Sequence, residues 1–530
     1  MSLTAIVLCR DAERDLPACL GSLAFADEIL VVDSGSRDRS REIASDRGAR
    51  VLERPLDGFD DQRNWAQARA AGDWVLFIDA DERVPPALAA EIRDALSTDG
   101  PAPAAWSIPR RNHFLGRPMA RCGWGRDRVT RLLRPGRARW QGRVHEVPVV
   151  QGAVGRLQKP LEHHPYPSLA AFWDKLERFS PMEAAADQEA GRRAGGLQML
   201  VRPKLAFARA YLAQGACREG VHGLVLSTMA AFAAFTRALR LWERGIPPGV
   251  TAPPRGPRIA EIPSETGAPV SVLITTFNEE ANIEGALASS AWADEVLVVD
   301  SFSTDRTMEL ASGASRVVQH EYVNPAAQKN WALPQLAHSW TMVLDADERF
   351  TPELAREVRH LLASPPPAAA FWIRRVNHFL GRRIRFCGWN RDRVIRLFDR
   401  RRSRYQDVEV HEEMEVDGAV GQLRSPLLHY TYTSVDQYWP KFRRYTDWGA
   451  SQAYREGRRA GLYHLLGHPA GRFLKMYVAR LGVLDGTHGL AISLMSFFSV
   501  FNKYAKLWER GLGEAVRERG APAEGRRTSR

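Results

Sequence analysis

Short apolar runs and helical patterns alternate near the start of the chain. The apolar runs cover residues 5–8, 29–33 and 74–79, and the helical patterns cover residues 16–23 and 40–47. This order is typical of βαβ units, in which parallel strands are joined by helices. The runs are rich in branched apolar residues, as a sheet covered on both faces requires. We therefore predict an α/β fold with a mostly parallel, buried sheet.

The same pattern returns further along the chain at a nearly constant offset. The sequence DADER at residues 79–83 recurs at residues 345–349, an offset of 266. Further matches pair residues 62–66 with 328–332, 144–146 with 410–412 and 241–245 with 507–511, and strands are predicted again at 272–275, 296–300 and 341–345. A period of this length indicates a duplicated domain, because solenoid repeats are typically about 20–50 residues long.

The repeat predicts a linker, two α/β domains and two helical extensions. The segment 246–269 is rich in Pro and Gly and lacks apolar periodicity, which is typical of a linker. We place an α/β domain at residues 1–165 with a helical extension at 166–245, and a second domain at 270–431 with an extension at 432–513. The tail at 514–530 is charged and contains Gly, so we expect it to be disordered.

Acidic residues stand at the carboxyl ends of two predicted strands in each copy. Asp33 and Asp79 end strands of copy one, and Asp300 and Asp345 end the equivalent strands of copy two. Open α/β sheets bind their ligands at this edge. Asp33 and Asp300 are followed by serine-containing turns, which suit hydrogen bonding to a base or ribose. An Asx turn that only shapes the loop is the alternative.

A second aspartate follows Asp79 and Asp345 two residues later, at Asp81 and Asp347. Two aspartates with this spacing offer hard oxygen ligands of the kind that Mg²⁺ or Mn²⁺ accepts. An ion held there would bridge to a diphosphate and neutralise it. A solvated turn before the next helix is the alternative. We favour the metal site because two acidic strand ends occur in this order twice.

Composition and charge narrow the class of protein. With 530 residues the chain exceeds what one core usually organises, and its five cysteines without regular close spacing indicate reduced thiols in the cytoplasm. The first residues are predicted to form a buried strand and not a signal peptide. A net charge of +12 suits nucleic acid, an anionic membrane surface or a phosphorylated substrate. Because neither a basic recognition helix nor aromatic residues interleaved on basic strands are found, we expect no nucleic acid partner.

These residues resemble family 2 glycosyltransferases with the GT-A fold. The resemblance rests on the apolar strand leading to NEE at 278–280, on the strand end VVD at 298–300 and on DAD at 345–347. More narrowly, a set of segments resembles the lipopolysaccharide-core glucosyltransferase-like subgroup: WADEV at 292–296, QKNW at 328–331, NHFLG at 377–381, VHE at 410–412 and KLWE at 506–509. The resemblance covers nearly all of each copy and implies two GT-A domains in tandem, each with a mostly helical extension.

The resemblance also implies a reaction. It is inverting transfer of a sugar from a nucleoside diphosphate sugar, such as a UDP-hexose, to a cell-envelope glycan or glycolipid such as lipopolysaccharide core. The residues implied at the nucleotide sugar are Glu13, Asp33 and Asp79 in copy one, and Asn278, Glu280, Asp300 and Asp345 in copy two. Asp81 and Asp347 are implied as the principal ligands of Mg²⁺ or Mn²⁺, assisted by Asp79 and Asp345.

Such a transfer needs a carboxylate to remove the proton of the acceptor hydroxyl. Our candidates are Glu146 and Glu412, in the Val-His-Glu element downstream of the metal segment. An ordinary surface strand is the alternative interpretation of that element, and Glu82 and Glu348 are the alternative bases. Arg131 and Arg396 offer guanidinium groups that suit phosphate oxygens, or that pair with aspartates in a solvated loop.

The two copies differ at the loop after the first strand, where DAE at 11–13 stands against NEE at 278–280, and Phe302 stands against Gly35. Neither change touches the metal pair, so we predict two competent sites. A sugar nucleotidyltransferase is an alternative, but it would favour a basic, Gly-rich loop where this chain is acidic. A binding protein for nucleotide sugar or glycan, with one copy inactive, is the other alternative, and the retained carboxylates argue against its extreme form.

Each copy ends in an apolar stretch, at residues 223–235 and 489–501, preceded by basic helical residues: Lys204, Arg209, Arg472, Lys475 and Arg480. The stretches fall short of the roughly 20 residues that span a bilayer. Because the implied acceptor is lipid-linked, we expect these helices to dock on the inner face of the cytoplasmic membrane. A helical subdomain packed on the catalytic domain is the alternative.

Overall fold

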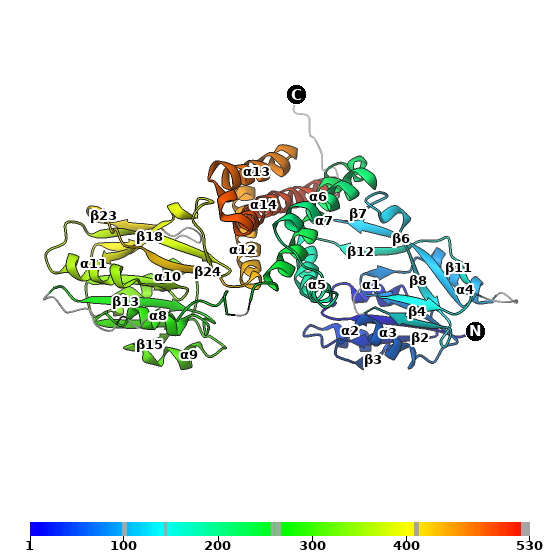
Figure 1. The fold of residues 1–530 in the computed structure, drawn as a ribbon. Coiled ribbons are helices and arrows are strands. Elements are labelled where there is room, and N and C mark those ends of the chain that lie inside the picture. Colours follow the sequence, from blue (N-terminus) through cyan, green and yellow to red (C-terminus); the bar gives the residue numbers. More distant parts are fainter. Residues whose placement is uncertain are drawn as a thin grey trace, which may run out of the picture. The chain divides into compact units, whose positions relative to one another are not determined.

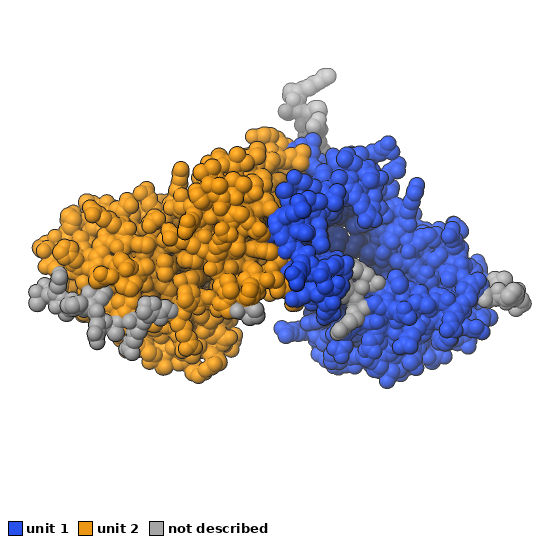
Figure 2. Space-filling model, in the orientation of Figure 1, with its two compact units in different colours: residues 1–241, 450–462, 504–530 blue, residues 242–449, 463–503 orange. Residues whose placement is uncertain are grey.

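The computed structural model describes residues 1–97, 103–142, 146–247, 249–255, 259, 267–406 and 413–520, and of residues 514–520 only the backbone. The chain divides into two compact units, coloured blue and orange in Figure 2. Unit 1 comprises Met1–Leu241, Ala450–Leu462 and Tyr504–Arg530, and unit 2 comprises Trp242–Gly449 and Tyr463–Lys503. Each copy of the repeat therefore supplies most of one unit, but the end of its last helix belongs to the other.

Unit 1 contains a ten-stranded mixed sheet and a two-stranded sheet. The large sheet has the order β3-β2-β1-β4-β8-β6-β12-β5, with β7 and β11 paired to β6, and the small one pairs β9 with β10. The strands are β1 (Leu3–Cys9), β2 (Glu28–Asp33), β3 (Arg50–Glu53), β4 (Trp74–Asp79), β5 (Glu82–Arg83), β6 (Ala105–Phe114), β7 (Arg117–Pro118), β8 (Arg128–Leu133), β9 (Ala138–Gln141), β10 (Val147–Val150), β11 (Val154–Arg156) and β12 (Leu161–Tyr166).

Unit 2 repeats this arrangement. Its large sheet has the order β15-β14-β13-β16-β20-β18-β24-β17, with β19 and β23 paired to β18, and its small sheet pairs β21 with β22. The strands are β13 (Val270–Thr276), β14 (Glu295–Asp300), β15 (Arg316–Gln319), β16 (Trp340–Asp345), β17 (Glu348–Arg349), β18 (Ala370–Phe379), β19 (Arg382–Arg383), β20 (Arg393–Asp399), β21 (Ser403–Tyr405), β22 (Met414–Val416), β23 (Val420–Gln422) and β24 (Leu427–Tyr432).

The helices follow the same duplicated order (Figure 1). Copy one supplies α1 (Leu16–Gly21), α2 (Ser40–Asp46), α3 (Phe59–Gln67), α4 (Pro86–Ser97), α5 (Leu169–Glu189), α6 (Gly196–Ala208) and α7 (Gly220–Glu243). Copy two supplies α8 (Ile283–Ser290), α9 (Thr307–Leu310), α10 (Pro325–Ala332), α11 (Pro352–Leu362), α12 (Val435–Arg455), α13 (Leu462–Leu474) and α14 (Gly486–Gly520). Short 3₁₀ turns are η1 (Trp124–Arg126), η3 (Ala216–Glu219), η4 (Ala311–Gly313), η5 (Leu333–Gln335), η6 (Trp389–Arg391) and η8 (Gly482–Asp485), and π-helical segments are η2 (Arg209–Ala213) and η7 (Lys475–Ala479).

Helices cover both faces of each sheet, because successive strand residues point to opposite sides. In unit 1, Val7 of β1 packs with α1 and α4 on one face, and Ile6 packs with α3 on the other. In unit 2, Ile274 of β13 packs with α8 and α11, and Leu273 packs with α10. The predicted α/β architecture is confirmed. The strands are apolar and buried up to their polar carboxyl ends, where the candidate site lies.

The parallel sheet predicted from the sequence forms only half of each large sheet. Strands β1, β2, β3 and β4 pair in parallel, and so do their counterparts in unit 2. From β8 onward the sheet is mixed, since β8 is antiparallel to both β4 and β6. Short connections such as the one through η1 permit antiparallel pairing without a crossover helix.

Two boundary predictions, the linker and the tail, differ from the structure. Ile259, inside the predicted linker, is buried in the core of unit 2 and its N–H donates to the carbonyl of Ala288. Helix α14 continues to Gly520, so the start of the tail at 514–530, which we predicted to be disordered, is helical. Residues 521–530 lie outside the described part of the chain.

The apolar stretches near the copy ends lie in helices longer than the sequence indicated. Within the part of the chain that the structure describes, the segments Ala216–Glu243 and Gly482–Gly513 are long and apolar enough to cross a bilayer by length and composition alone. A buried core helix meets the same criterion, and 78% of the first segment's apolar window and 44% of the second's are buried in the protein. Helix α7 therefore turns much of its apolar surface inward, as the packed-subdomain alternative predicts.

Candidate functional site

The site of unit 1 begins at Asp79, the last residue of β4. The preceding strand residues from Trp74 to Ile78 are fully buried, so Asp79 stands where the core ends. Its carboxylate accepts hydrogen bonds from Arg63 of α3 at 2.8 Å and from Arg131 of β8 at 2.5 Å. Burial alone would raise the pKa of Asp79, but the Arg131 and Arg63 charges hold it well below its ordinary range. Asp79 is therefore ionised and held by two cations.

In unit 2 the end of β16 resembles the end of β4, with one partner of the aspartate changed. Asp345 accepts a hydrogen bond from Arg396 of β20, and Lys329 of α10 lies 3.8 Å from it. Arg396 also donates to Glu348 at 2.9 Å. The pKa of Asp345, which burial would raise, is held far below its ordinary range by Arg396 and Lys329. Lys329 in copy two therefore takes the place of Arg63 in copy one as a cation beside the first aspartate.

The second aspartate of the pair meets different partners. Asp81 accepts a hydrogen bond from Lys175 Nζ of α5 at 2.7 Å, and its Oδ1 lies 3.6 Å from His163 Nε2 of β12. Burial would raise the pKa of Asp81, but Lys175 and His163 lower it. In unit 2, Asp347 lies 3.5 Å from His429 Nε2, and the nearby charge of Lys441 helps to lower its pKa, which burial would raise.

The protonation of His163 is set by its neighbours. Its Nδ1 lies 2.5 Å from Asn112 Oδ1, and the amide of Asn112 is oriented because Nδ2 donates to Asp127 Oδ2 at 2.9 Å. Nδ1 therefore carries the proton and donates it. Burial lowers the pKa of His163 to about 4, so the ring is neutral near pH 7. Its Nε2 lone pair then faces Asp81 Oδ1, while the other carboxylate oxygen, Oδ2, accepts a hydrogen bond from Lys175 Nζ.

Unit 2 keeps the same relay. His429 Nδ1 lies 2.6 Å from Asn377 Oδ1, and Asn377 Nδ2 donates to Asp392 Oδ2 at 2.9 Å. Hydrogen bonds of this kind behind a metal-binding histidine fix its tautomer and aim its free nitrogen. In each unit the imidazole Nε2 thus lies beside the second aspartate, 3.6 Å from Asp81 in unit 1 and 3.5 Å from Asp347 in unit 2. Among the described residues, no three His, Cys, Asp and Glu side chains gather closely enough to hold a metal by themselves.

The candidate bases lie at different depths. Glu146 is 13% exposed and accepts a hydrogen bond from Arg63 Nε at 2.7 Å, so one guanidinium bridges it to Asp79. Glu82 is fully buried, and burial followed by the charge of Asp79 raises its pKa to about 7. Its oxygens are engaged by the Asp79 N–H and by Arg110. Glu348 is also fully buried, and Glu412 lies outside the described residues.

The nucleotide-side aspartates shape their own loops. Asp33 is fully buried and accepts hydrogen bonds from the N–H groups of Gly35 and Ser36, each at 2.9 Å, and from the Ser36 hydroxyl. Asp300 does the same with Ser303 in unit 2. The Asx-turn alternative therefore describes what these two carboxylates do in the structure.

The loop after the first strand is braced against the loop that follows the second strand. In unit 1, Glu13 accepts a hydrogen bond from the Arg39 N–H at 3.3 Å. In unit 2, Asn278 accepts from the Thr304 N–H at 2.8 Å, and Glu280 accepts from the Arg306 N–H at 3.2 Å. The three side chains predicted to lie at the nucleotide thus hold the two loops together.

One difference between the copies reaches the aspartate pair. Glu279, which stands where copy one has Ala12, is held by Asn282 Nδ2 at 2.7 Å. Burial and then the charge of Asp347 raise its pKa to about 7. We expected this position to belong to a nucleotide-side loop, but its carboxyl is also influenced by the second aspartate of the pair. The two sites therefore differ in acidic content.

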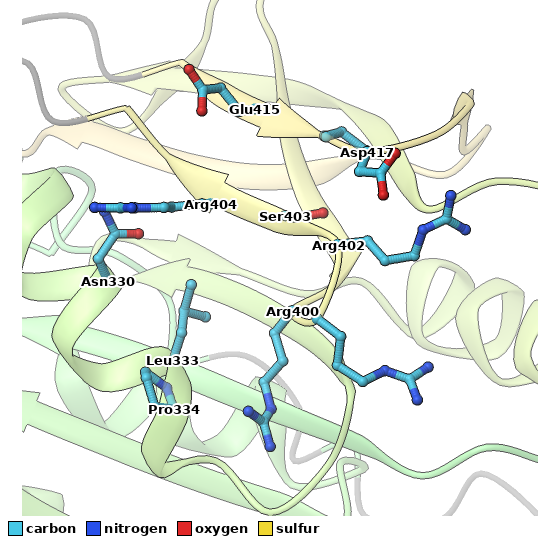
Figure 3. A pocket seen from close by; sticks show the side chains of 11 residues that line it. Asn330, Leu333, Pro334, Arg400, Arg402, Ser403, Arg404, Glu415 and Asp417 are labelled. Carbon is cyan, nitrogen blue, oxygen red and sulfur yellow. The ribbon is translucent and has the colours of Figure 1, made fainter.

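A pocket of about 720 Å³ in unit 2 is separate from this chemistry (Figure 3). It lies between the end of α10 and the turn joining β20 to β21, and four arginines line it: Arg400, Arg401, Arg402 and Arg404. Arg400 donates to two backbone carbonyls, and Arg401 pairs with Asp399. The pocket includes neither aspartate of the pair, so the acidic strand end remains the candidate site.

Several residues of the site were not found from the sequence. They are His163, Lys175 and Asn112 in copy one, with His429, Lys441 and Asn377 in copy two. The signal was present, because the histidines and lysines recur at the offset of 266 that relates the copies. Arg131 and Arg396, which we expected in a loop or on phosphate, lie in strands and pair with the first aspartate.

Substituting Arg131→Leu should destabilise unit 1, because it leaves the partly buried carboxylate of Asp79 and the fully buried one of Glu82 without their shared cation. We expect the free energy of unfolding to fall by about 3–5 kcal/mol, as when one partner of a buried ion pair is removed. Urea denaturation measures the change. The control is Arg39→Leu, whose pair with Glu42 is mostly exposed and which should cost less than about 1 kcal/mol. Equal effects of the two variants would contradict the prediction.

Comparisons with known proteins identify the family of the chain. The family model for Glycosyl transferase family 2 matches residues 4–152 and 271–420. The lipopolysaccharide core biosynthesis glycosyltransferase LpsC of Rhizobium meliloti is 28% identical over 252 residues, which cover 46% of this chain and 93% of that protein. A glycosyltransferase of Rickettsia typhi is 27% identical over 256 residues, covering 46% and 88%. Each relative corresponds in length to about one copy.

A solved structure of TarS residues 1–349 from S. aureus aligns with a TM-score of 0.23 and 15% identity, over 46% of this chain and 84% of that chain. The family match is the stronger finding, since it covers the α/β part of both copies and more than half of all residues. This chain therefore belongs to glycosyltransferase family 2 and carries the GT-A fold twice in tandem.

Proposed function

We propose that each copy transfers a sugar from a nucleoside diphosphate sugar, of the UDP-hexose class, to a cell-envelope glycan or glycolipid such as lipopolysaccharide core. Membership of family 2 supports sugar transfer, and the printed role of the Rhizobium relative supports this acceptor class. The observation that carries the proposal is His163 Nε2 lying 3.6 Å from the Asp81 carboxylate at the end of β4, with Nδ1 held by Asn112. Attack by an acceptor hydroxyl in a single displacement inverts the sugar carbon.

In this proposal Asp81 and His163 hold Mg²⁺ or Mn²⁺ in copy one, and Asp347 and His429 hold it in copy two. A site with one carboxylate and one imidazole would hold the ion with few protein ligands, as many magnesium sites do. When bound, the ion neutralises the diphosphate leaving group. Lys175 adds positive charge at the same place, because its Nζ lies against Asp81.

The residues on the nucleotide side act through the backbone in this proposal. Asp33 and Asp300 are fully buried, so they support donor binding by holding the loop after the second strand in shape. Glu13, Asn278 and Glu280 join that loop to the one after the first strand. Asp79 and Asp345, held by arginine and lysine, fix the positions of the metal-side aspartates.

Glu146 removes the acceptor proton in the proposed mechanism of copy one, and Glu412 does so in copy two. Arg63 supports this assignment for Glu146, since it bonds both Glu146 and Asp79 and so keeps the base beside the aspartate pair. Glu82 is a poorer candidate because its carboxyl is fully buried and already hydrogen-bonded.

We also place the protein at the inner face of the cytoplasmic membrane, through helices other than the buried α7. Helix α6 exposes Leu197 and Leu205, which are 69% and 63% exposed. Helix α13 exposes Leu466 and Leu474, at 50% and 57%. These apolar positions are spaced as on one helix face. Exposed basic residues lie in the same helices or at the start of the π-helical segments that follow them: Lys204 in α6, Arg209 in η2, Arg472 in α13 and Lys475 in η7. An apolar face flanked by cations fits an anionic lipid surface.

The variants Asp81→Asn and Asp347→Asn test the two metal sites. In calorimetric titration with UDP-glucose and other nucleotide sugars in the presence of Mn²⁺, we expect two binding sites in the wild type, one in each variant and none in the double variant. A chelator should abolish binding in the wild type. Asp46→Asn, exposed on α2, is the control and should keep both sites. A variant that keeps both sites would exclude its aspartate from the mechanism.

The base assignment is tested in the Asp347→Asn background, where only copy one reports. Glu146→Gln should lower kcat by about 10²–10⁴-fold, the usual range for a general base, while the KM for the donor stays unchanged. Steady-state transfer assays measure both constants. Glu42→Gln, 69% exposed on α2, is the matched control and should leave kcat unchanged. An unaltered kcat in Glu146→Gln would return the role to another carboxylate.

Paired substitutions test membrane docking. Leu197→Asp with Leu205→Asp, and Leu466→Asp with Leu474→Asp, each place charge on an apolar helix face. We expect flotation with vesicles containing phosphatidylglycerol to weaken by about tenfold or more, because a buried leucine contributes roughly 1.5–3 kcal/mol. Val154→Asp, at an exposed position of β11, is the control. Wild-type protein that does not float with these vesicles would refute the docking.

A further inference from the structure

The first helix of the unit 1 extension is capped by a residue from the far end of the chain. Helix α5 begins at Leu169, whose N–H donates to Glu509 Oε1 at 2.9 Å. The side chain of its own N-cap, Ser168, accepts from the Ala171 N–H at 3.2 Å. The first N–H groups of a helix have no partner within the helix, and a carboxylate there is favoured by the helix dipole. Glu509 therefore stabilises the start of α5, although it belongs to copy two.

Unit 2 contains the reciprocal contact. Helix α12 begins at Val435, whose N–H donates to Glu243 Oε1 at 2.6 Å. Glu243 is the last residue of α7 and belongs to copy one. Val435 is the repeat equivalent of Leu169, and Glu509 is the equivalent of Glu243. The same capping contact thus occurs twice, and each time the carboxylate comes from the other copy.

Aromatic contacts repeat this exchange beside each cap. In unit 1, Trp508 lies edge-on to His222 with ring centroids 4.9 Å apart, and His222 in turn contacts Phe114 of β6 at 6.4 Å. In unit 2, the equivalent rings are those of Trp242, His488 and Phe379, with centroids 4.9 Å and 6.3 Å apart. Each unit's large sheet is therefore joined, through a histidine, to a tryptophan of the other copy.

The capped helices lead to the candidate sites. Lys175, which hydrogen-bonds Asp81, lies less than two helical turns after Leu169 on α5. Lys441 occupies the equivalent position of α12. The start of α5 therefore bears on where Lys175 meets Asp81. A contact made by the end of one copy thus bears on the site of the other.

We propose that the Leu-Trp-Glu-Arg-Gly segment at the end of each copy is a docking element for the other copy. Trp508 and Glu509 complete unit 1, and Trp242 and Glu243 complete unit 2. The two copies fold as a mutually dependent pair, and neither site is fully built from its own repeat. This inference goes beyond the transfer reaction, because it concerns which part of the chain supports which site.

Amide hydrogen exchange of the full-length chain, measured by mass spectrometry, tests whether the end of each copy stabilises a helix of the other copy. No substrate is needed. In Glu509→Ala, amides at the start of α5 should exchange about fivefold faster, as expected for the loss of a helix cap, while those at the start of α12 stay unchanged. Glu243→Ala should do the reverse and serves as the matched comparison. Faster exchange in the variant's own copy, in both helices or in neither would overturn the proposal.

Conservative variants separate the cap from general damage. Glu509→Gln keeps an oxygen that can accept from the Leu169 N–H, so it should restore most of the slow exchange at α5. Glu353→Ala, at an exposed position of α11, should leave both helix starts unchanged. If Glu509→Gln exchanges as fast as Glu509→Ala at α5, the hydrogen bond from Leu169 is not the stabilising contact, and the proposal fails. Because no ligand is added, these outcomes do not depend on the proposed sugar transfer.

Discussion

Negative charge at the end of a buried strand is the constraint on which each unit depends. A carboxylate withdrawn from water costs several kcal/mol unless a cation meets it. In unit 1 the cations for Asp79 come from α3 and β8, and the partners of Asp81 come from β12 and α5. The ion pairs and hydrogen bonds of these two aspartates therefore hold β8, β12 and α5 against the parallel half of the sheet.

The parallel half of each sheet could be predicted because its signals are local. The run from Trp74 to Asp79 is apolar up to its last residue, and the structure makes it a strand with the acid at its end. The site partners could not be found in this way, because His163 and Lys175 follow Asp79 by more than eighty residues and carry no local signature. The internal repeat held that information, since both recur in copy two.

The exchange of helix ends was beyond sequence reasoning for a different reason. Both copies end in the same Leu-Trp-Glu-Arg-Gly segment, so either end could cap either helix as far as residue chemistry is concerned. Only chain geometry decides between them. Differences between the copies are informative in the opposite way: Lys329 for Arg63 keeps the charge, whereas Glu279 for Ala12 adds acid to one site. The cation beside the first aspartate is therefore kept in both copies, whereas the acidic residue near the second aspartate is present in only one.

Crossed helix ends also bear on how such a gene can change over generations. In a plain tandem fusion, a premature stop codon after copy one would leave one intact enzyme, and selection could discard the second half. Here a stop before Trp508 removes the residues that dock on unit 1, so the loss reaches the copy that was still translated. A truncation that spares every residue of copy one would therefore still remove contacts from unit 1.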